Sequence, residues 1–159
     1  MSSQRIITNL WFDTEAEQAA EFYCSIFEDA RIVSVVPYAE GTDKAGTPVT
    51  VEWELLGQRF VGINGGPQFS FTEAISLQIV CEDQAEIDRY WERLTDGGSE
   101  GACGWCKDRY GVSWQVTPRG LDQLFTGDPE AASRAMQAMF GMRKLDLAAL
   151  HAARDAVLA

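Results

Sequence analysis

One order of secondary structure occurs twice in this sequence, and that duplication limits the possible folds more than any other feature. The first pass, residues 5–64, reads as a strand, a helix and further short strands. The second pass, residues 73–117, repeats the order with two or three short strands after its helix. The two passes share their architecture without obvious residue identity. The pattern predicts two βαβββ modules.

Each pass contains a helix that the sequence marks at its start and along its buried face. Thr14 followed by Glu17 predicts a capping box in the first pass, and Asp83 followed by Glu86 predicts one in the second. Apolar residues then recur at helical spacing, so each helix should pack one stripe onto a sheet. The stripes are Ala16, Ala19, Ala20, Tyr23, Ile26 and Phe27 in the first helix, and Ile87, Tyr90, Trp91 and Leu94 in the second.

Alternation and turn residues locate the strands. Residues 49–55 alternate apolar and polar side chains, which is typical of a half-buried strand. Gly57-Gln58 is expected to form the tight turn that follows it. Gly65-Gly66-Pro67 then separates the two passes. The expected strands are residues 5–12, 31–38, 49–55, 59–64, 73–81, 102–107 and 112–117.

The end of the chain differs from both modules because helical signals replace strands. Asp128-Pro129 is an N-cap with Pro at the first helical position, and Asp146 opens a second helix. The expected stripes are Ala132, Met136, Met139 and Phe140, then Leu147, Leu150 and Leu158. A Met-rich stripe can bind a partner, but more often it packs on its own domain or on a twin subunit. We divide the chain into modules at residues 1–66 and 67–120 and a helical tail at 121–159.

Composition and charge exclude several classes of protein. The chain has 159 residues, 46% of them hydrophobic, which suffices for one compact domain or two fused half-domains. It has no apolar run of the roughly 18 residues that a membrane span needs. The first residues, MSSQRIITNL, lack the apolar segment of a secretory signal, so we expect a cytoplasmic protein. Acidic residues outnumber basic ones 24 to 13, which argues against a nucleic-acid partner.

Aromatic and glycine-rich motifs run through both modules. They are Leu10-Trp11-Phe12, Phe22-Tyr23, Gly62-Ile63-Asn64-Gly65-Gly66-Pro67 with Phe69 and Phe71, Cys103-Gly104-Trp105, Lys107-Asp108 and Tyr110-Gly111-Val112-Ser113-Trp114-Gln115. These motifs resemble the PhnB-like branch of the vicinal oxygen chelate superfamily, over nearly the whole chain, including Met136-Gln137-Ala138-Met139 in the tail. That branch is related to glyoxalase I and bleomycin-resistance proteins. The resemblance implies an α+β fold in which the curved mixed sheets of paired βαβββ modules form a cup, commonly completed in a homodimer.

The branch is often labelled as a 3-demethylubiquinone-9 3-methyltransferase domain, but the residues do not support methyl transfer. A Rossmann-type adenosylmethionine site needs a glycine-rich turn between a strand and a helix. The nearest candidate, residues 62–66, follows an expected strand but leads into Pro67 and Phe69. We therefore treat the label as a name and predict no such cofactor.

Metal-using relatives place four His, Glu or Gln ligands on four strands, pointing into the cup. The resemblance puts these positions within Ile6–Asn9, near Asn64 or Gly65, near Ser76, and at Gln115. None is His, Asp, Glu or Cys, the ligands that Zn²⁺ and Fe²⁺ prefer. The nearest carboxylate, Glu73, is expected on the strand face opposite Ser76. We predict a cup without a metal ion or other cofactor.

Strand alternation predicts which side chains line the cup. If Ile75, Leu77 and Ile79, and likewise Val112, Trp114 and Val116, pack on the second helix, their neighbours face the cup. Aromatic walls with a few neutral hydrogen-bonding groups suit a small organic ligand. The alternative is that these polar groups bond to one another and to trapped water. The candidate ligand-binding residues are Trp11, Phe60, Asn64, Phe69, Ser76, Gln78, Cys103, Trp105, Ser113 and Gln115.

The cysteines and the single histidine offer little catalytic chemistry. Cys103 and Cys106 form a C-x-x-C motif, but on a strand their sulfurs diverge, and no second pair completes a zinc site. Cys103 is the member that matches the family pattern, either as a reactive thiol beside Lys107 or, more simply, as a small buried residue. His151, in the tail, is expected at the surface.

The leading prediction is that a metal-free cup binds or transforms a small apolar or aromatic molecule in a homodimer, with no nucleic-acid or membrane partner. One alternative is a metal-dependent lyase, isomerase or dioxygenase of the glyoxalase type. Another is an inert or regulatory dimer whose cup has no ligand. No catalytic base is evident, so the sequence leaves open whether any reaction occurs.

Overall fold

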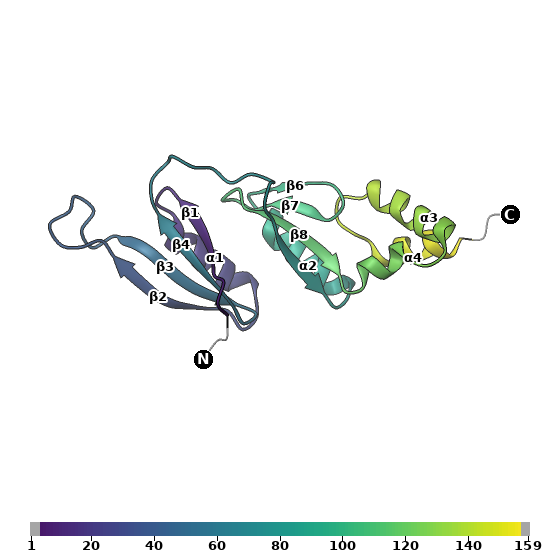
Figure 1. Cartoon of the computed structure of the whole chain (residues 1–159), viewed down its shortest axis with the longest axis horizontal. Helices are drawn as coiled ribbons and strands as arrows, with labels where there is room; N and C mark the ends of the chain where they lie inside the picture. The colour runs from purple at the N-terminus through teal and green to yellow at the C-terminus, as the bar shows by residue number, and fades with distance from the viewer. Residues whose placement is uncertain (1–3, 157–159) are drawn as a thin grey trace. The chain divides into compact units, whose positions relative to one another are not determined.

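The chain forms two units, residues 1–71 and 72–159, each built on its own four-stranded mixed sheet. In the computed structural model, which describes residues 4–156, the order strand, helix and three strands occurs in both units (Figure 1). Two helices and a short 3₁₀ segment follow the second sheet. The predicted α+β class and the duplicated βαβββ order are therefore confirmed.

The first unit consists of β1 (Thr8–Phe12), α1 (Ala16–Ile26), β2 (Arg31–Pro37), β3 (Pro48–Leu55) and β4 (Gln58–Asn64). Its strands lie in the order β1-β4-β3-β2, with β1 parallel to β4 and the other pairs antiparallel. The β3–β4 turn is one residue earlier than predicted. Leu55 pairs with Gln58, so Leu56 and Gly57, both with positive φ, form the turn.

The core of the first unit lies between α1 and the sheet. All six residues of the predicted α1 stripe are buried, including Ile26 and Phe27 at its end. Trp53 on β3 is fully buried and stacks between Tyr23 of α1 and Phe60 of β4, with ring centroids 5.8 and 5.9 Å away. Gly62 lies under α1, because a Cβ there would be 2.9 Å from the Ala16 Cβ. This close approach brings the sheet against the helix.

The start of α1 differs from the prediction. Glu15 occupies the N-cap without a side-chain cap, and its own carboxylate accepts from the Thr14 N–H, so the Thr14–Glu17 capping box is wrong. Instead the Asn64 side chain reaches from β4 and its Oδ1 accepts from the Ala16 N–H at 2.8 Å. A residue at the end of the sheet therefore satisfies an N–H that a local cap would otherwise bond.

The second unit begins with β5 (Leu77–Cys81), α2 (Gln84–Thr95), β6 (Ser99–Glu100), β7 (Trp105–Lys107) and β8 (Ser113–Pro118), in the sheet order β5-β8-β7-β6. The predicted cap of α2 is confirmed, since Asp83 accepts from the Glu86 N–H, while the return bond from Glu86 reaches the N–H of Glu82, one residue before the cap. The predicted stripe of α2 is buried. The first strand begins only at Leu77, so Ile75 lies outside it and is 64% exposed rather than packed under α2.

The C-terminal segment consists of η1 (Leu121–Phe125), α3 (Pro129–Phe140) and α4 (Leu147–Asp155). Both predicted N-caps, Asp128 and Asp146, are confirmed. The stripe of α3 was predicted correctly only in part: Met139 packs on the core, but Met136 and Phe140 are exposed, and Ala135, which was not predicted, is buried. Leu150 is buried as expected, and Leu158 lies outside the described residues. The segment's own small core contains Leu124, Ala135, Leu145 and Leu150.

Candidate functional site

The face of the second sheet opposite α2, called here its open face, carries most of the predicted ligand-binding residues. Trp114 and Val116 of β8 are buried toward the helix. Their neighbours Ser113 and Gln115 therefore lie on the open face. In the ladder, Gln115 is opposite both Trp105 of β7 and Gln78 of β5, and Lys107 is opposite Ser113. Residues paired across a ladder share a face, so the structure brings these side chains together.

Several polar side chains of the open face are already paired with one another. Gln115 Nε2 donates to Ser76 Oγ at 2.9 Å. Gln78 Nε2 donates to Thr117 Oγ1 at 2.8 Å, and Thr117 Oγ1 donates to the Ile79 carbonyl. These groups have hydrogen bonds without a ligand, which is the arrangement that the alternative interpretation of the sequence expected.

Ser113 is different, because it lines a cavity and its hydroxyl is unpaired. The side chain is only 2% exposed, and within residues 4–156 its Oγ has no hydrogen-bond partner. A buried hydroxyl without a partner costs free energy and calls for an explanation. The cavity has a volume of about 180 Å³, and the residues that line it include Glu73, Ser99, Glu100, Trp105, Lys107 and Ser113.

Charged groups at this cavity form two ion pairs. Lys107 Nζ lies 2.6 Å from Glu73 Oε1, and this hydrogen bond holds the pKa of the Glu73 carboxyl below its usual range. Glu100 accepts from Trp91 Nε1 at 3.0 Å and pairs with Arg143 at 3.3 Å, and these contacts lower its pKa. The cavity thus combines an indole, a hydroxyl and one ammonium group whose partner is an exposed glutamate.

Three residues at this cavity were not predicted from the sequence as site residues: Lys107, Glu73 and Glu100. Lys107 could have been found, because it follows Trp105 by two residues on β7 and shares its face. Glu73 precedes β5, and its position depends on the conformation of a loop rather than on strand alternation.

Cys103 lies away from the open face. It sits in a turn before β7 with φ of 57°, and its Sγ contacts the Met139 carbonyl of α3 at 3.6 Å. Cys106 lies on β7 and is buried, and burial raises the pKa of its thiol to about 12, with Asp108 and Glu100 adding to the effect. Both thiols are free. The motif was predicted not to act as a pair on a strand, and the structure shows that only Cys106 lies on one.

The predicted site residues of the first unit divide between the two faces of its sheet. Trp11 points away from α1, donates from Nε1 to the Gly66 carbonyl at 2.8 Å, and contacts Phe69 edge to face at 5.1 Å. Phe69 is 67% exposed. Phe60 and Asn64, which were expected in the cup, instead face α1. Phe60 stacks on Trp53, and the Asn64 side chain bonds to Ala16 and to the Pro48 carbonyl.

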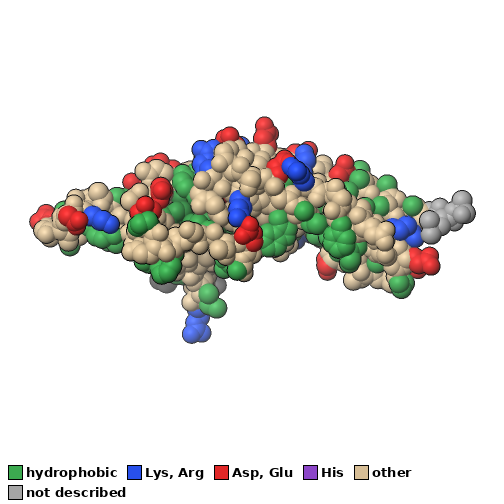
Figure 2. Space-filling model, turned by 90° about the horizontal axis from the view of Figure 1, so that it is seen from above, with side chains coloured by type: hydrophobic (Ala, Val, Ile, Leu, Met, Phe, Trp, Pro, Cys, Tyr) green, Lys and Arg blue, Asp and Glu red, His purple; other side chains and the backbone are tan. Residues whose placement is uncertain are grey.

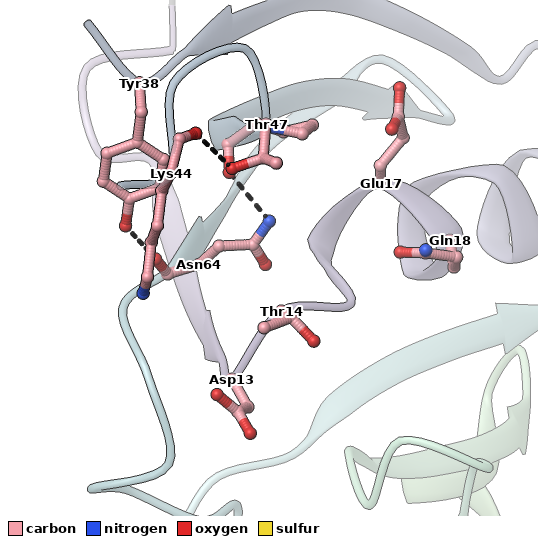
Figure 3. Close-up of a pocket in the computed structure, with 9 residues that line it drawn as sticks. Asp13, Thr14, Glu17, Gln18, Tyr38, Lys44, Thr47 and Asn64 are labelled. Carbon is pink, nitrogen blue, oxygen red and sulfur yellow. Dashed lines mark hydrogen bonds between the residues drawn. The ribbon is translucent and has the colours of Figure 1, made fainter. Parts of the chain in front are cut away.

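A second cavity, of about 330 Å³, lies at the end of the first sheet. Figure 3 shows Tyr38, Lys44 and Thr47 on one side and Asp13, Thr14, Glu17 and Gln18 on the other, with Asn64 between them. The Tyr38 hydroxyl donates to the Asn64 carbonyl, and Lys44 lies over the Tyr38 ring. The polar atoms at its base therefore bond to one another.

The described residues do not provide the donor set that superfamily metals use. Within residues 4–156, no three His, Cys, Asp or Glu side chains lie close enough together to hold a metal ion. Of the positions that the resemblance suggested, Asn64 faces α1, and Ser76 and Gln115 bond to each other. Amides and hydroxyls of this kind fit Zn²⁺ or Fe²⁺ poorly.

The surface and the helices add three observations. In the view of Figure 2, acidic and basic side chains are interspersed, with apolar side chains exposed between them. None of the helices within residues 4–156 has the length and apolar character required to cross a bilayer. His151 is exposed on α4, as predicted.

Comparisons with known proteins show the family of the chain and its fold. A family model described as 3-demethylubiquinone-9 3-methyltransferase matches residues 4–117. A solved PhnB protein from Bacillus cereus is 38% identical with a TM-score of 0.67, and the match covers 72% of this chain and 99% of that one. No curated protein matches the chain.

Two more distant solved structures share the fold alone. A protein from Pseudomonas aeruginosa is 19% identical with a TM-score of 0.63, and the match covers 73% of this chain and 98% of that one. The fosfomycin resistance protein FosX from Mesorhizobium loti is 15% identical with a TM-score of 0.54, covering 74% of this chain and 92% of that one.

Proposed function

The chain belongs to the PhnB-like family of the vicinal oxygen chelate superfamily, and from this premise we propose that it binds a small aromatic molecule on the open face of its second sheet. The observation that carries the proposal is the buried, unpaired hydroxyl of Ser113, a residue that lines a cavity together with Trp105. A ligand that accepts or donates one hydrogen bond would satisfy this hydroxyl while its ring packs on Trp105.

The site that we propose consists of Ser76, Gln78, Trp105, Ser113 and Gln115, together with Lys107. Trp11 and Phe69 contact each other on the first unit and are not part of the proposed site. Phe60, Asn64 and Cys103 are left out, because their side chains bond or pack elsewhere.

The family name implies methyl transfer, but the residues do not fit a methyl donor of the adenosylmethionine type. Residues 62–66 end β4 and lead to Pro67, and the next element along the chain is β5 rather than a helix. No helix N-terminus therefore follows the glycines. The proposal includes no methyl-transfer step and no metal ion.

The binding proposal is tested by titrating benzyl alcohol into the wild-type protein and following tryptophan fluorescence and backbone NMR shifts. We expect saturable binding that the Trp105→Ala variant weakens by about tenfold, since packing between two aromatic rings contributes on the order of 1 kcal/mol. Phe140→Ala, which removes an exposed aromatic ring of α3, is the matched control and should bind as the wild type does. Equal binding by both variants, or none by the wild type, would refute the proposal and favour an inert protein.

Elemental analysis of protein purified without chelator tests the metal-free part of the proposal. We expect no stoichiometric Zn, Ni, Mn or Fe, since the open face lacks carboxylate, imidazole and thiolate ligands in a suitable group. One equivalent of any of these metals, retained after dialysis, would instead support glyoxalase-type chemistry.

We also propose that the chain works as a cytoplasmic homodimer. Support comes from β2, the edge strand of the first sheet, where Ile32, Val33, Val35 and Val36 are exposed. Exposed apolar edge strands are commonly covered by another chain. Sedimentation equilibrium should give twice the chain mass of 17.6 kDa, and a monomer at micromolar concentration would contradict this part of the proposal.

A further inference from the structure

The cavity beside Ser113 also contains features that specify the charge of a ligand. Lys107 of β7 is opposite Ser113 in the ladder, so the ammonium and the unpaired hydroxyl belong to one face and line one cavity. Its volume of about 180 Å³ equals the liquid volume of about six water molecules, which fits a single ring with one small substituent.

Glu73 is ion-paired with the Lys107 ammonium, but it is the more easily displaced member of the pair. Lys107 lies within a strand of the sheet and its side chain is 35% exposed. Glu73 precedes the first strand of the unit and its side chain is 64% exposed. An ion pair with one such exposed partner contributes about 1 kcal/mol or less to stability.

The second acidic group at the cavity, Glu100, should repel an anionic ligand only weakly, because its charge is already paired. Glu100 is bonded by the indole N–H of Trp91 and paired with Arg143. If Glu73 moves out toward water, the ammonium of Lys107 remains at the cavity without a bonded counterion, because Glu100 keeps its own partners. An anionic ligand would restore that balance.

We propose that the ligand is a small aromatic carboxylate, whose ring packs on Trp105 while its carboxylate takes the place of Glu73 on Lys107 and accepts a hydrogen bond from Ser113. The inference rests on the proposed function, because it assigns a charge to the ligand of the same site. Charge-assisted hydrogen bonds to a carboxylate are stronger than neutral ones, so Lys107 should dominate affinity. Glu73 competes with the ligand for the ammonium.

Calorimetric titration of the full chain with benzoate, benzyl alcohol and benzylamine tests this assignment. We expect benzoate to bind at least about tenfold more tightly than benzyl alcohol, and benzylamine to bind most weakly, because only benzoate brings a negative charge to the Lys107 ammonium. Lys107→Met should remove the preference for benzoate without affecting benzyl alcohol. Ser113→Ala should weaken benzoate by about threefold to tenfold.

Glu73→Gln provides the sharpest readout, because it should strengthen benzoate binding by about threefold to tenfold, whereas loss of a merely structural residue would weaken it. Glu82→Gln is the matched control, since Glu82 is likewise ion-paired in this unit, to Arg119, but is not among the residues that line the cavity. Lys44→Met, in the first unit, is the control for Lys107→Met.

The outcomes separate the two proposals. If benzyl alcohol binds as well as benzoate and Glu73→Gln has no effect, the carboxylate assignment is wrong while the aromatic site stands. If benzylamine binds best, the ligand pairs with Glu73 and the assignment is also wrong. If none of the three compounds binds, the proposed function fails and the assignment fails with it.

Discussion

The two units have the same strand order, yet they satisfy their polar groups in different ways. In the first unit, Asn64 at the end of the sheet bonds to the first turn of α1, across 48 positions of sequence. In the second unit, α2 is capped locally by Asp83, its own N-cap residue. The sheet of the first unit is therefore needed to complete its helix, whereas the helix of the second unit is locally complete.

The sheet faces away from the helices also differ between the units, and here the second unit is the one with an unpaired polar group. In the first unit this face carries two cross-strand ion pairs, Glu54 with Arg31 and Glu52 with Arg59. In the second unit it carries the cavity with the unpaired Ser113 hydroxyl. The first unit does contain an unpaired polar atom, Trp53 Nε1, but this atom lies in the core under α1. The same face of one fold therefore carries paired charges in the first unit and a buried, unpaired hydroxyl in the second.

The largest effect should come from the core of the first unit. Trp53→Ala removes a fully buried indole between two aromatic rings, and we expect it to lower the free energy of unfolding by about 3–5 kcal/mol. Trp105→Ala, on the open face of the second unit, removes a half-buried indole and should cost less than half as much. Urea-induced unfolding followed by circular dichroism measures both, and equal losses would contradict the contrast between core and open face.

A smaller effect should separate the two ways of starting a helix. Asn64→Ala leaves the Ala16 N–H and the Pro48 carbonyl without their partner, and should cost about 2–3 kcal/mol because both contacts are buried or partly buried. Asp83→Ala removes an exposed cap and should cost about 1 kcal/mol. Denaturant midpoints at constant m-value check the order of the two variants. A larger loss in Asp83→Ala would mean that the long-range cap is not important.

The sequence allowed prediction of those features whose signal is local. The Asp83 cap, the N-caps of Asp128 and Asp146, and the buried stripes of α1 and α2 all follow from residues within one or two helical turns. The cap of α1 could not be predicted in this way, because Asn64 is distant in sequence and no residue near Thr14 indicates that it bonds there. Tertiary contact replaced the local capping box there.

The candidate site shows the same division. The open-face positions of Ser113, Gln115 and Gln78 follow from alternation along strands. The position of Phe60 was predicted wrongly, although pairing across the hairpin with buried Trp53 could have placed it on the α1 face. The pairing of Glu73 with Lys107 depends on the conformation of the residues before β5, for which no sequence periodicity exists.

The smallest expected change in the free energy of unfolding is also the most informative about the open face, because its sign is opposite to that of the other variants. Ser113→Ala removes a buried hydroxyl that has no partner, and we expect it to stabilise the protein by about 1 kcal/mol, as the unpaired group carries a desolvation penalty. Thr117→Val is the matched control on the same strand. Its hydroxyl accepts from Gln78 and donates to the Ile79 carbonyl, so its removal should destabilise by about 1 kcal/mol.

Thermal unfolding of the two variants against the wild type measures the signs directly. A higher midpoint for Ser113→Ala together with weaker benzoate binding would show that the hydroxyl is retained for ligand at a cost in stability. A lower midpoint would mean that Ser113 has a partner in solution, such as a bound water in the cavity. In that case the open face of the second unit would be as fully satisfied as that of the first, and the contrast between the units would reduce to their helix caps.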